Sequence, residues 1–261
     1  MTWTEALLSI AAGLVISVVT TPVGVSGAVF LLPVQLSVLA VPNPAVTPTN
    51  LLFNVVSGPG ALLRYRRRGS LASPLTRLLL VGTLPGVVVG AVVRVFVVPG
   101  PDVFRLIVSL LLLPLGLWLC LRPPAPEPRA DPVSRRGIAG LALGVGVVGG
   151  IYGIGGGSII GPVLVGRGMP MAVVAPAALA STFVTSVAGA AAFAVLALTG
   201  RGDIAPDWGV GILCGVGGLI GGYLGAHLQP RLPERALRLV LGGLAIALAV
   251  LYAGQAVLRA G

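Results

Sequence analysis

Apolar runs follow one another along nearly the whole chain, from Thr4 to Val257, and short Gly/Pro-rich or Arg-rich stretches separate them. A helix that spans the hydrocarbon core of a bilayer needs about 20 predominantly apolar residues. The runs predict five helical segments in each half of the chain, and we therefore expect an all-α polytopic membrane protein. The segments are approximately 5–20, 27–40, 46–63, 76–97 and 103–121, then 137–151, 158–167, 173–199, 207–227 and 235–257.

Composition excludes a soluble domain and argues against an enzyme. Hydrophobic residues make up 56% of the 261 and charged residues only 9%, whereas soluble domains carry about 25% charged residues. Both cysteines lie in apolar segments, His227 is the one histidine, and the seven acidic residues are scattered. We expect no catalytic residues, no metal site and no cofactor.

The two halves share a sequence register, which is the signature of an internal repeat. GVSGAVFLLPV (24–34) aligns with GIGGGSIIGPV (153–163), and Gly90-Ala91 later pairs with Gly225-Ala226. We expect a first transmembrane repeat over 1–122, a Pro-rich cytoplasmic linker over 123–134 and a second transmembrane repeat over 135–261. The second segment of each repeat follows a Gly-rich break and is short, so it predicts a broken or re-entrant helix at the repeat interface.

The arginines predict opposite orientations for the two repeats. The net charge is +10, and twelve of the 17 arginines fall in 64–77, 122–136 and 229–238. Cytoplasmic loops of membrane proteins are rich in Arg and Lys, so these three regions can all face the cytoplasm of a bacterial inner membrane. Corresponding loops of the two repeats then lie on opposite sides. Arginines in such short loops do not predict nucleic-acid binding.

The two Gly-rich breaks are the first candidate site. TPVGVSG (21–27) and YGIGGGS (152–158) occupy equivalent positions, and the helix that follows each break has free N–H groups that suit an anion. The alternative is that these glycines only permit close helix packing. The candidate substrate-binding residues of the breaks are Gly24, Ser26, Gly27, Gly155, Gly156, Gly157 and Ser158.

A polar face on the third segment of each repeat is the second candidate. In the first repeat it carries Thr49, Asn50 and Asn54, and in the second Ser181 and Thr182. These side chains can donate hydrogen bonds to an anion. The Ser and Thr hydroxyls can equally bond to carbonyl groups of their own helix, whereas an unpaired Asn is costly to bury. We therefore favour the two asparagines.

Arg94 stands inside an apolar segment, which requires a reason. It can contact an anion in a vestibule of the transport path. It also lies a few residues from the expected end of its helix, and this position favours snorkelling of the guanidinium to the membrane interface.

The residues around the breaks resemble the TauE/SafE family of sulfite exporters. The resemblance rests on GVSGAVFLLP (24–33) and GIGGGSIIGP (153–162), each followed by a proline-containing turn and a Thr/Ser/Asn-bearing helix. The helices that begin near Asp102 and Glu234 add to it. Ser26 replaces a glycine of the family pattern, and Asn50 replaces a serine. Membership implies an inner-membrane carrier of sulfite, thiosulfate or organosulfonates.

The sequence thus predicts a secondary transporter that moves a small sulfur-containing anion by alternating access. A passive anion channel and a non-transporting membrane assembly subunit stay open as alternatives. The expected partners are the anion and the lipid bilayer. The oligomeric state, with a homodimer as one option, the exact substrate, the direction of transport and the coupling ion are not fixed by the sequence.

Overall fold

The computed structural model describes residues 1–67, 71, 73–97, 101–121, 134–199 and 204–260. This part of the chain is all helical, with ten α-helices and no strand. The first five α-helices are α1 (Trp3–Thr20), α2 (Ala28–Ser37), α3 (Val46–Arg66), α4 (Pro74–Phe96) and α5 (Pro101–Leu121). The other five are α6 (Arg135–Tyr152), α7 (Gly157–Gly166), α8 (Met171–Ala197), α9 (Trp208–Leu228) and α10 (Glu234–Ala260).

These bounds confirm the ten predicted segments and the all-α membrane class. Among the described residues, four helices are long and apolar enough to cross a membrane: Trp3–Val23, Pro74–Phe96, Met171–Ala197 and Trp208–Arg231. The helices after the breaks, α2 and α7, have only 10 residues each, or about 15 Å at 1.5 Å per residue. Neither can span a bilayer alone, as the sequence predicted.

Local sequence signals account for where the helices begin. Thr2 and Glu5 form a capping box at the start of α1. The side chains of Ser73, Ser134 and Asp207 accept backbone N–H groups at the starts of α4, α6 and α9. Such caps satisfy N–H groups that have no partner within the helix.

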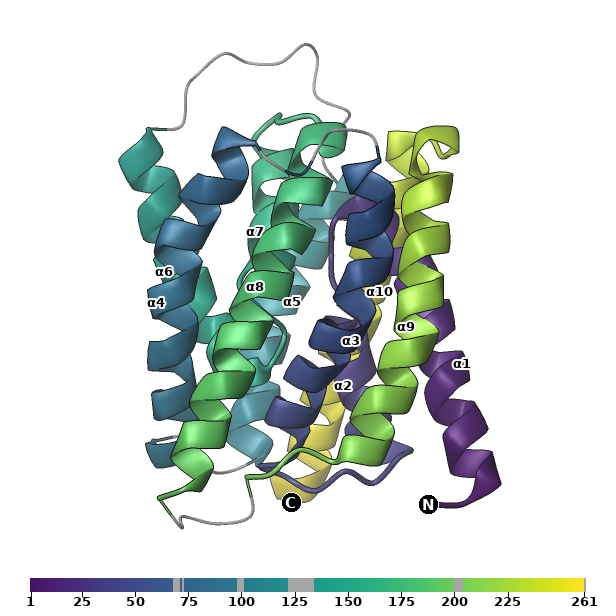
Figure 1. Cartoon of the computed structure of the whole chain (residues 1–261), viewed down its shortest axis with the longest axis vertical. Coiled ribbons are helices and arrows are strands. Elements are labelled where there is room, and N and C mark those ends of the chain that lie inside the picture. The colour runs from purple at the N-terminus through teal and green to yellow at the C-terminus, as the bar shows by residue number, and fades with distance from the viewer. Residues whose placement is uncertain (68–70, 72, 98–100, 122–133, 200–203, 261) are drawn as a thin grey trace.

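The bundle is built from two helix groups, each of which mixes the two halves of the chain. The first helix group contains α1, α2, α3 and α9, and the second contains α4, α6, α7 and α8. Figure 1 shows α1 and α9 at one side of the bundle, α4 and α6 at the other, and α3 and α8 between them. The groups meet mainly where α3 packs on α8, while α5 and α10 pack on each other.

Glycine stripes bring the outer helix pairs into backbone contact. A Cβ added to Gly86 or Gly90 of α4 would lie 2.5 and 2.2 Å from carbonyl oxygens of α6. A Cβ added to Gly217 or Gly221 of α9 would lie 2.0 and 2.2 Å from carbonyl oxygens of α1. Small residues let membrane helices approach this closely. Each stripe therefore fixes a helix of one half against the first helix of the other half.

The helix ends that flank the Arg-rich regions lie at one end of the bundle. In Figure 1, α3 and α9 finish and α4, α6 and α10 begin at the upper end, whereas the N- and C-termini lie at the lower end. This arrangement agrees with the prediction that 64–77, 122–136 and 229–238 share one side. The linker is outside the described residues from 122 to 133, so its structure is not tested. The inverted duplication stays a prediction.

Candidate functional site

The two Gly-rich breaks have nearly the same backbone conformation. Gly24 has φ 75° and ψ 20°, and Gly153 has φ 71° and ψ 19°. A Cβ added to Gly24 would lie 2.5 Å from the Cα of Ala175, and one added to Gly153 would lie 2.2 Å from the carbonyl oxygen of Thr47. Left-handed conformation and lack of space both favour glycine here. Each break is thus packed against the first turns of the third helix of the other half.

A small cavity with several polar side chains in its lining lies beside the first break. The volume in which the centre of a water molecule fits is about 30 Å³. The lining comes from α1, the first break, α3, α8 and α9. Of the residues predicted from the sequence, the cavity brings together Ser26, Gly27, Asn54 and Thr182. Ser17, Thr21 and Ser57 supply three further hydroxyl groups to the lining, and Phe183 supplies an aromatic wall.

Asn54 connects the cavity to both breaks. The hydroxyl of Ser26 donates to Asn54 Oδ1, and Asn54 Nδ2 donates to the carbonyl oxygen of Gly153 at 3.4 Å. Ser26 Oγ also accepts the backbone N–H of Ala28 at 3.1 Å, at the start of α2. The exposed fraction of the Asn54 side chain is 2%. One buried amide therefore holds the first break, the second break and α3 in a fixed relation.

The second break is held by hydroxyl groups of α8. The backbone N–H of Gly156 donates to Thr185 Oγ1 at 3.1 Å, and Ser158 Oγ lies 3.4 Å from Thr182 Oγ1. Ser181 Oγ lies 3.0 Å from Thr83 Oγ1 of α4. These side chains link the break to the second helix group, and Thr182 also reaches the cavity.

The remaining predicted residues lie outside the cavity lining. The Thr49 hydroxyl donates to the carbonyl of Ala45 and accepts the backbone N–H of Asp207. Asn50 Nδ2 donates to the carbonyl of Ala28 at 2.9 Å, while Asn50 Oδ1 is buried without a partner among the described residues. Also outside the lining are Gly24, Gly155, Gly156, Gly157, Ser158 and Ser181.

Arg94 does not snorkel, so that expectation is wrong. Its side chain is 0% exposed. Its Nε donates to Thr47 Oγ1 at 3.1 Å, and its Nη2 donates to Asn43 Oδ1. The guanidinium turns into the protein because these oxygens stand at the start of α3, opposite the end of α4. Contact between Arg94 and an anion in a vestibule stays a prediction.

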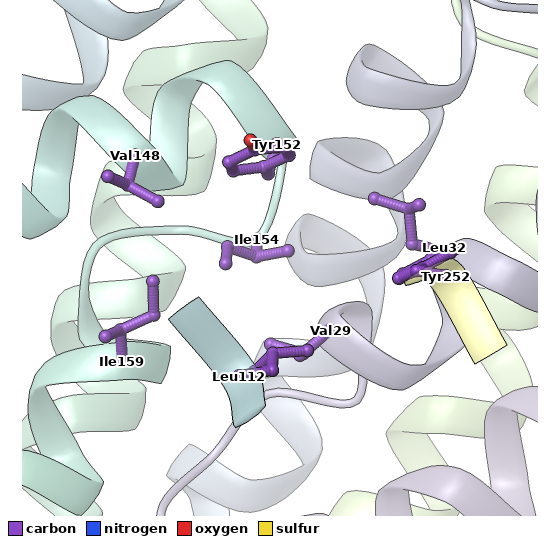
Figure 2. Close-up of a pocket in the computed structure, with 8 residues that line it drawn as sticks. All are labelled: Val29, Leu32, Leu112, Val148, Tyr152, Ile154, Ile159 and Tyr252. Carbon is purple, nitrogen blue, oxygen red and sulfur yellow. The ribbon is translucent and has the colours of Figure 1, made fainter. Parts of the chain in front are cut away.

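A second cavity lies where the second break, α2, α6 and α7 face α5 and α10. It is apolar. It offers about 20 Å³ to the centre of a water molecule. Figure 2 shows Ile154 of the second break pointing toward its middle and Tyr152 at its upper edge. The other lining residues are Val29, Leu32, Leu112, Val148, Ile159 and Tyr252. An anion would lose its hydration here with little compensation, so this cavity does not suit one.

Sequence reasoning missed Ser17, Thr21 and Ser57. Ser17 and Thr21 are four residues apart and precede the first break directly, so helical spacing was a usable signal. Ser57 is three residues after Asn54 on the same helix. These positions were hidden because their neighbours are apolar and no charge marks them.

The cavity is lined by neutral donor groups and, among the described residues, by no charged side chain. Hydroxyl groups and a carboxamide can surround an oxyanion without the cost of a buried charged side chain. Gly27, the residue directly before α2, also lines the cavity. The dipole of α2 favours negative charge at this end, while the N–H of Ala28 already donates to Ser26 Oγ. No group of three or more His, Cys, Asp or Glu residues that could hold a metal ion occurs in the described part of the chain.

One comparison with known proteins gives a match. The model of the family described as sulfite exporter TauE/SafE matches residues 9–252, which is nearly the whole chain. No curated protein and no solved structure matches the chain significantly.

Proposed function

Because this chain belongs to the sulfite exporter TauE/SafE family, we propose that it is a secondary transporter that moves sulfite or a closely related sulfur oxyanion by alternating access. The family consists of membrane transporters for sulfur-containing anions and not of enzymes. The multi-pass helical structure agrees with that class. Within the proposal, the membrane is the bacterial inner membrane, with the Arg-rich loops on the cytoplasmic side.

The cavity around Asn54 is the observation that supports this function best. It gathers Ser26, Asn54 and Thr182 from three separate elements, and it lies where the two breaks are joined. Ser17, Thr21 and Ser57 add donors from two sides. We assign the anion to this cavity, which must widen during transport to take a sulfur oxyanion.

Alternating access is supported by the way the helix groups are built. α4 packs on α6, and α9 packs on α1, so equivalent helices make equivalent contacts in the two halves. Inverted repeats commonly place a site at their interface and expose it to each side in turn by rocking of one unit against the other. In this proposal the first and second helix groups are the two units, and the α3–α8 contact is where they move.

Counterflow in proteoliposomes tests the proposal. Vesicles that contain the purified full-length chain are loaded with unlabelled sulfite and diluted into a trace of labelled sulfite. A carrier accumulates label transiently, since internal sulfite drives exchange. Thiosulfate, sulfate and a small sulfonate added outside as competitors rank the substrates. The assay is repeated with each of the other three anions as the loaded and labelled species, and the absence of counterflow for all four would reject a secondary carrier of this class.

The two alternatives predict different results. A passive anion channel gives unitary currents and no counterflow. A membrane assembly subunit gives neither, and it co-purifies with a stable partner. Protein-free vesicles and vesicles with the Asn54→Leu variant are measured at the same sulfite concentrations. Their counterflow supplies the baseline for each comparison.

A further inference from the structure

Arg94 joins the two helix groups at one end of their interface. It belongs to α4 of the second group, and it donates hydrogen bonds to Thr47 in the first turn of α3 and to Asn43 just before α3, in the first group. Thr47 Oγ1 in turn donates to the carbonyl oxygen of Ile151 in α6 at 3.3 Å. Thr47 and Arg94 are 0% exposed, whereas Asn43 is half-buried. The chain of bonds therefore runs from near the surface into the interface.

A buried polar stripe leads from these bonds toward the cavity. Thr47, Asn50, Asn54 and Ser57 follow one another at spacings of three, four and three residues, which places them on one face of α3. All four are buried. We call them the α3 polar stripe. Polar side chains inside a transmembrane helix are costly and mark pathways for polar solutes. Asn50, between Thr47 and Asn54, keeps an unpartnered buried oxygen.

The corresponding position of the other half does not join the groups. The register that pairs Gly90 with Gly225 pairs Arg94 with Gln229. Gln229 Nε2 donates to the carbonyl oxygen of Pro22 at 2.8 Å. Pro22 follows α1, so this bond links α9 and α1 within the first helix group. The two ends of the interface thus differ. Arg94 makes a bond between the two helix groups, whereas the bond of Gln229 stays within one group.

We propose that Arg94, Thr47 and Asn43 form a latch that closes the Arg94 end of the pathway in this conformation. Breaking the latch lets α3 separate from α4 and opens the α3 polar stripe to solvent from that end. The purpose of the latch rests on the proposed transport function. The opening of the latch is a property of the protein alone and can be measured without substrate. The role of Arg94 is positional: it sets the balance between closed and open states.

The size of the effect follows from the bonds removed. A hydrogen bond made by a charged group stabilises the state that contains it. Its loss shifts a two-state equilibrium by about ten-fold or more. Arg94→Leu removes the bonds to Thr47 and Asn43. Thr47→Val keeps the shape of the side chain and removes one acceptor of Arg94, so its effect should be smaller.

Cysteine labelling from each side of the membrane tests the latch. The reporter is Asn50→Cys in a chain with Cys120→Ser and Cys214→Ala, and the probe is a membrane-impermeant methanethiosulfonate applied to oriented vesicles. We expect Arg94→Leu to raise the labelling rate from the Arg94 end by about ten-fold and Thr47→Val to raise it less. Gln229→Leu is the matched control and should leave that rate unchanged.

The outcomes separate the latch from the transport function. Faster labelling from the Arg94 end in Arg94→Leu and Thr47→Val, but not in Gln229→Leu, supports the latch whether or not sulfite is carried. Equal rates in all variants that retain the wild-type elution profile and unfolding midpoint overturn the latch, even if counterflow of sulfite is observed. Faster labelling from both ends also overturns it, because that result indicates general loosening.

Discussion

Asn54 of α3 and Gly153 of the second break are joined by a hydrogen bond from Nδ2 to the carbonyl oxygen, 3.4 Å long. The bond connects positions 99 residues apart and crosses from the first helix group to the second. The other atom of the same amide, Oδ1, accepts the hydroxyl of Ser26 in the first break. A single side chain that lines the cavity is therefore bonded to both breaks.

The first prediction concerns this amide. Asn54→Leu removes the acceptor of Ser26 and the donor to Gly153, so we expect loss of sulfite binding and a lower unfolding midpoint. Leaving buried polar groups unpaired costs about 1–3 kcal/mol. Isothermal titration of the purified protein with sulfite and thermal unfolding in detergent measure the two effects.

Thr49→Val tests whether the anion binds in the cavity or contacts the wider set of residues predicted from the sequence. Thr49 bonds to Ala45 and Asp207 and lies outside the cavity lining. We expect an unchanged dissociation constant for sulfite in this variant. Equal losses of affinity in Asn54→Leu and Thr49→Val would contradict the assignment of the anion to the cavity.

The second prediction separates backbone strain from lack of space at the breaks. Gly153 and Gly168 both have positive φ, 71° and 93°. An added Cβ at Gly153 would meet the Thr47 carbonyl at 2.2 Å, whereas at Gly168 nothing lies within 4 Å. Gly168→Ala should cost about 1–2 kcal/mol from conformation alone. Gly153→Ala should cost roughly 1–3 kcal/mol more from overpacking. Thermal unfolding of the pair gives the difference, and equal midpoints would refute the close contact.

The third prediction uses two glycines of α6. Gly146 packs on α4, where an added Cβ would lie 2.7 Å from the Thr83 carbonyl, but Gly144 has open space. Gly144→Ala should stabilise the helix by about 0.5–1 kcal/mol, since alanine is the better helix former. Gly146→Ala should lower the unfolding midpoint. If both substitutions raise it, the helices are not packed as closely as the structure describes.

The helices could be predicted from the sequence because membrane helices are marked by continuous apolar runs. Every predicted segment has its counterpart, and the short α2 and α7 followed from the Gly-rich breaks before them. The predicted duplication rests on glycines and prolines, which recur where the backbone has special requirements. The Gly82, Gly86 and Gly90 stripe and its partner in α9 were not recognised, because glycine is common in membrane helices.

The candidate site was only partly predictable because side-chain direction is set by packing between distant segments. Asn54 and Thr182 face the cavity, while Thr49 faces the chain that precedes α9. Nothing within α3 distinguishes these two polar faces. Arg94 was misplaced for the same reason: its partners Thr47 and Asn43 are 47 and 51 residues away. Closeness to a helix end predicted snorkelling, and only the fold shows acceptors inside.

The last prediction concerns Gln35 in α2. Its side chain is 0% exposed, and neither Nε2 nor Oε1 has a hydrogen-bond partner among the described residues. The register that pairs Pro33 with Pro162 pairs Gln35 with Leu164, which is also 0% exposed. Gln35→Leu should therefore raise the unfolding free energy by about 1–3 kcal/mol, since an unpaired amide is removed from an apolar setting.

Two matched substitutions make the Gln35 result interpretable. Thr20 Oγ1 is likewise buried without a partner in the described residues, so Thr20→Val should be neutral or stabilising. Thr185 Oγ1 accepts the N–H of Gly156 and donates to the backbone carbonyl of Ser181 in its own helix, so Thr185→Val should destabilise. Thermal unfolding in one detergent measures all three. A lower midpoint for Gln35→Leu would show that the amide has a partner in the membrane-embedded protein, and the first repeat would then hold a polar contact that Leu164 of the second cannot make.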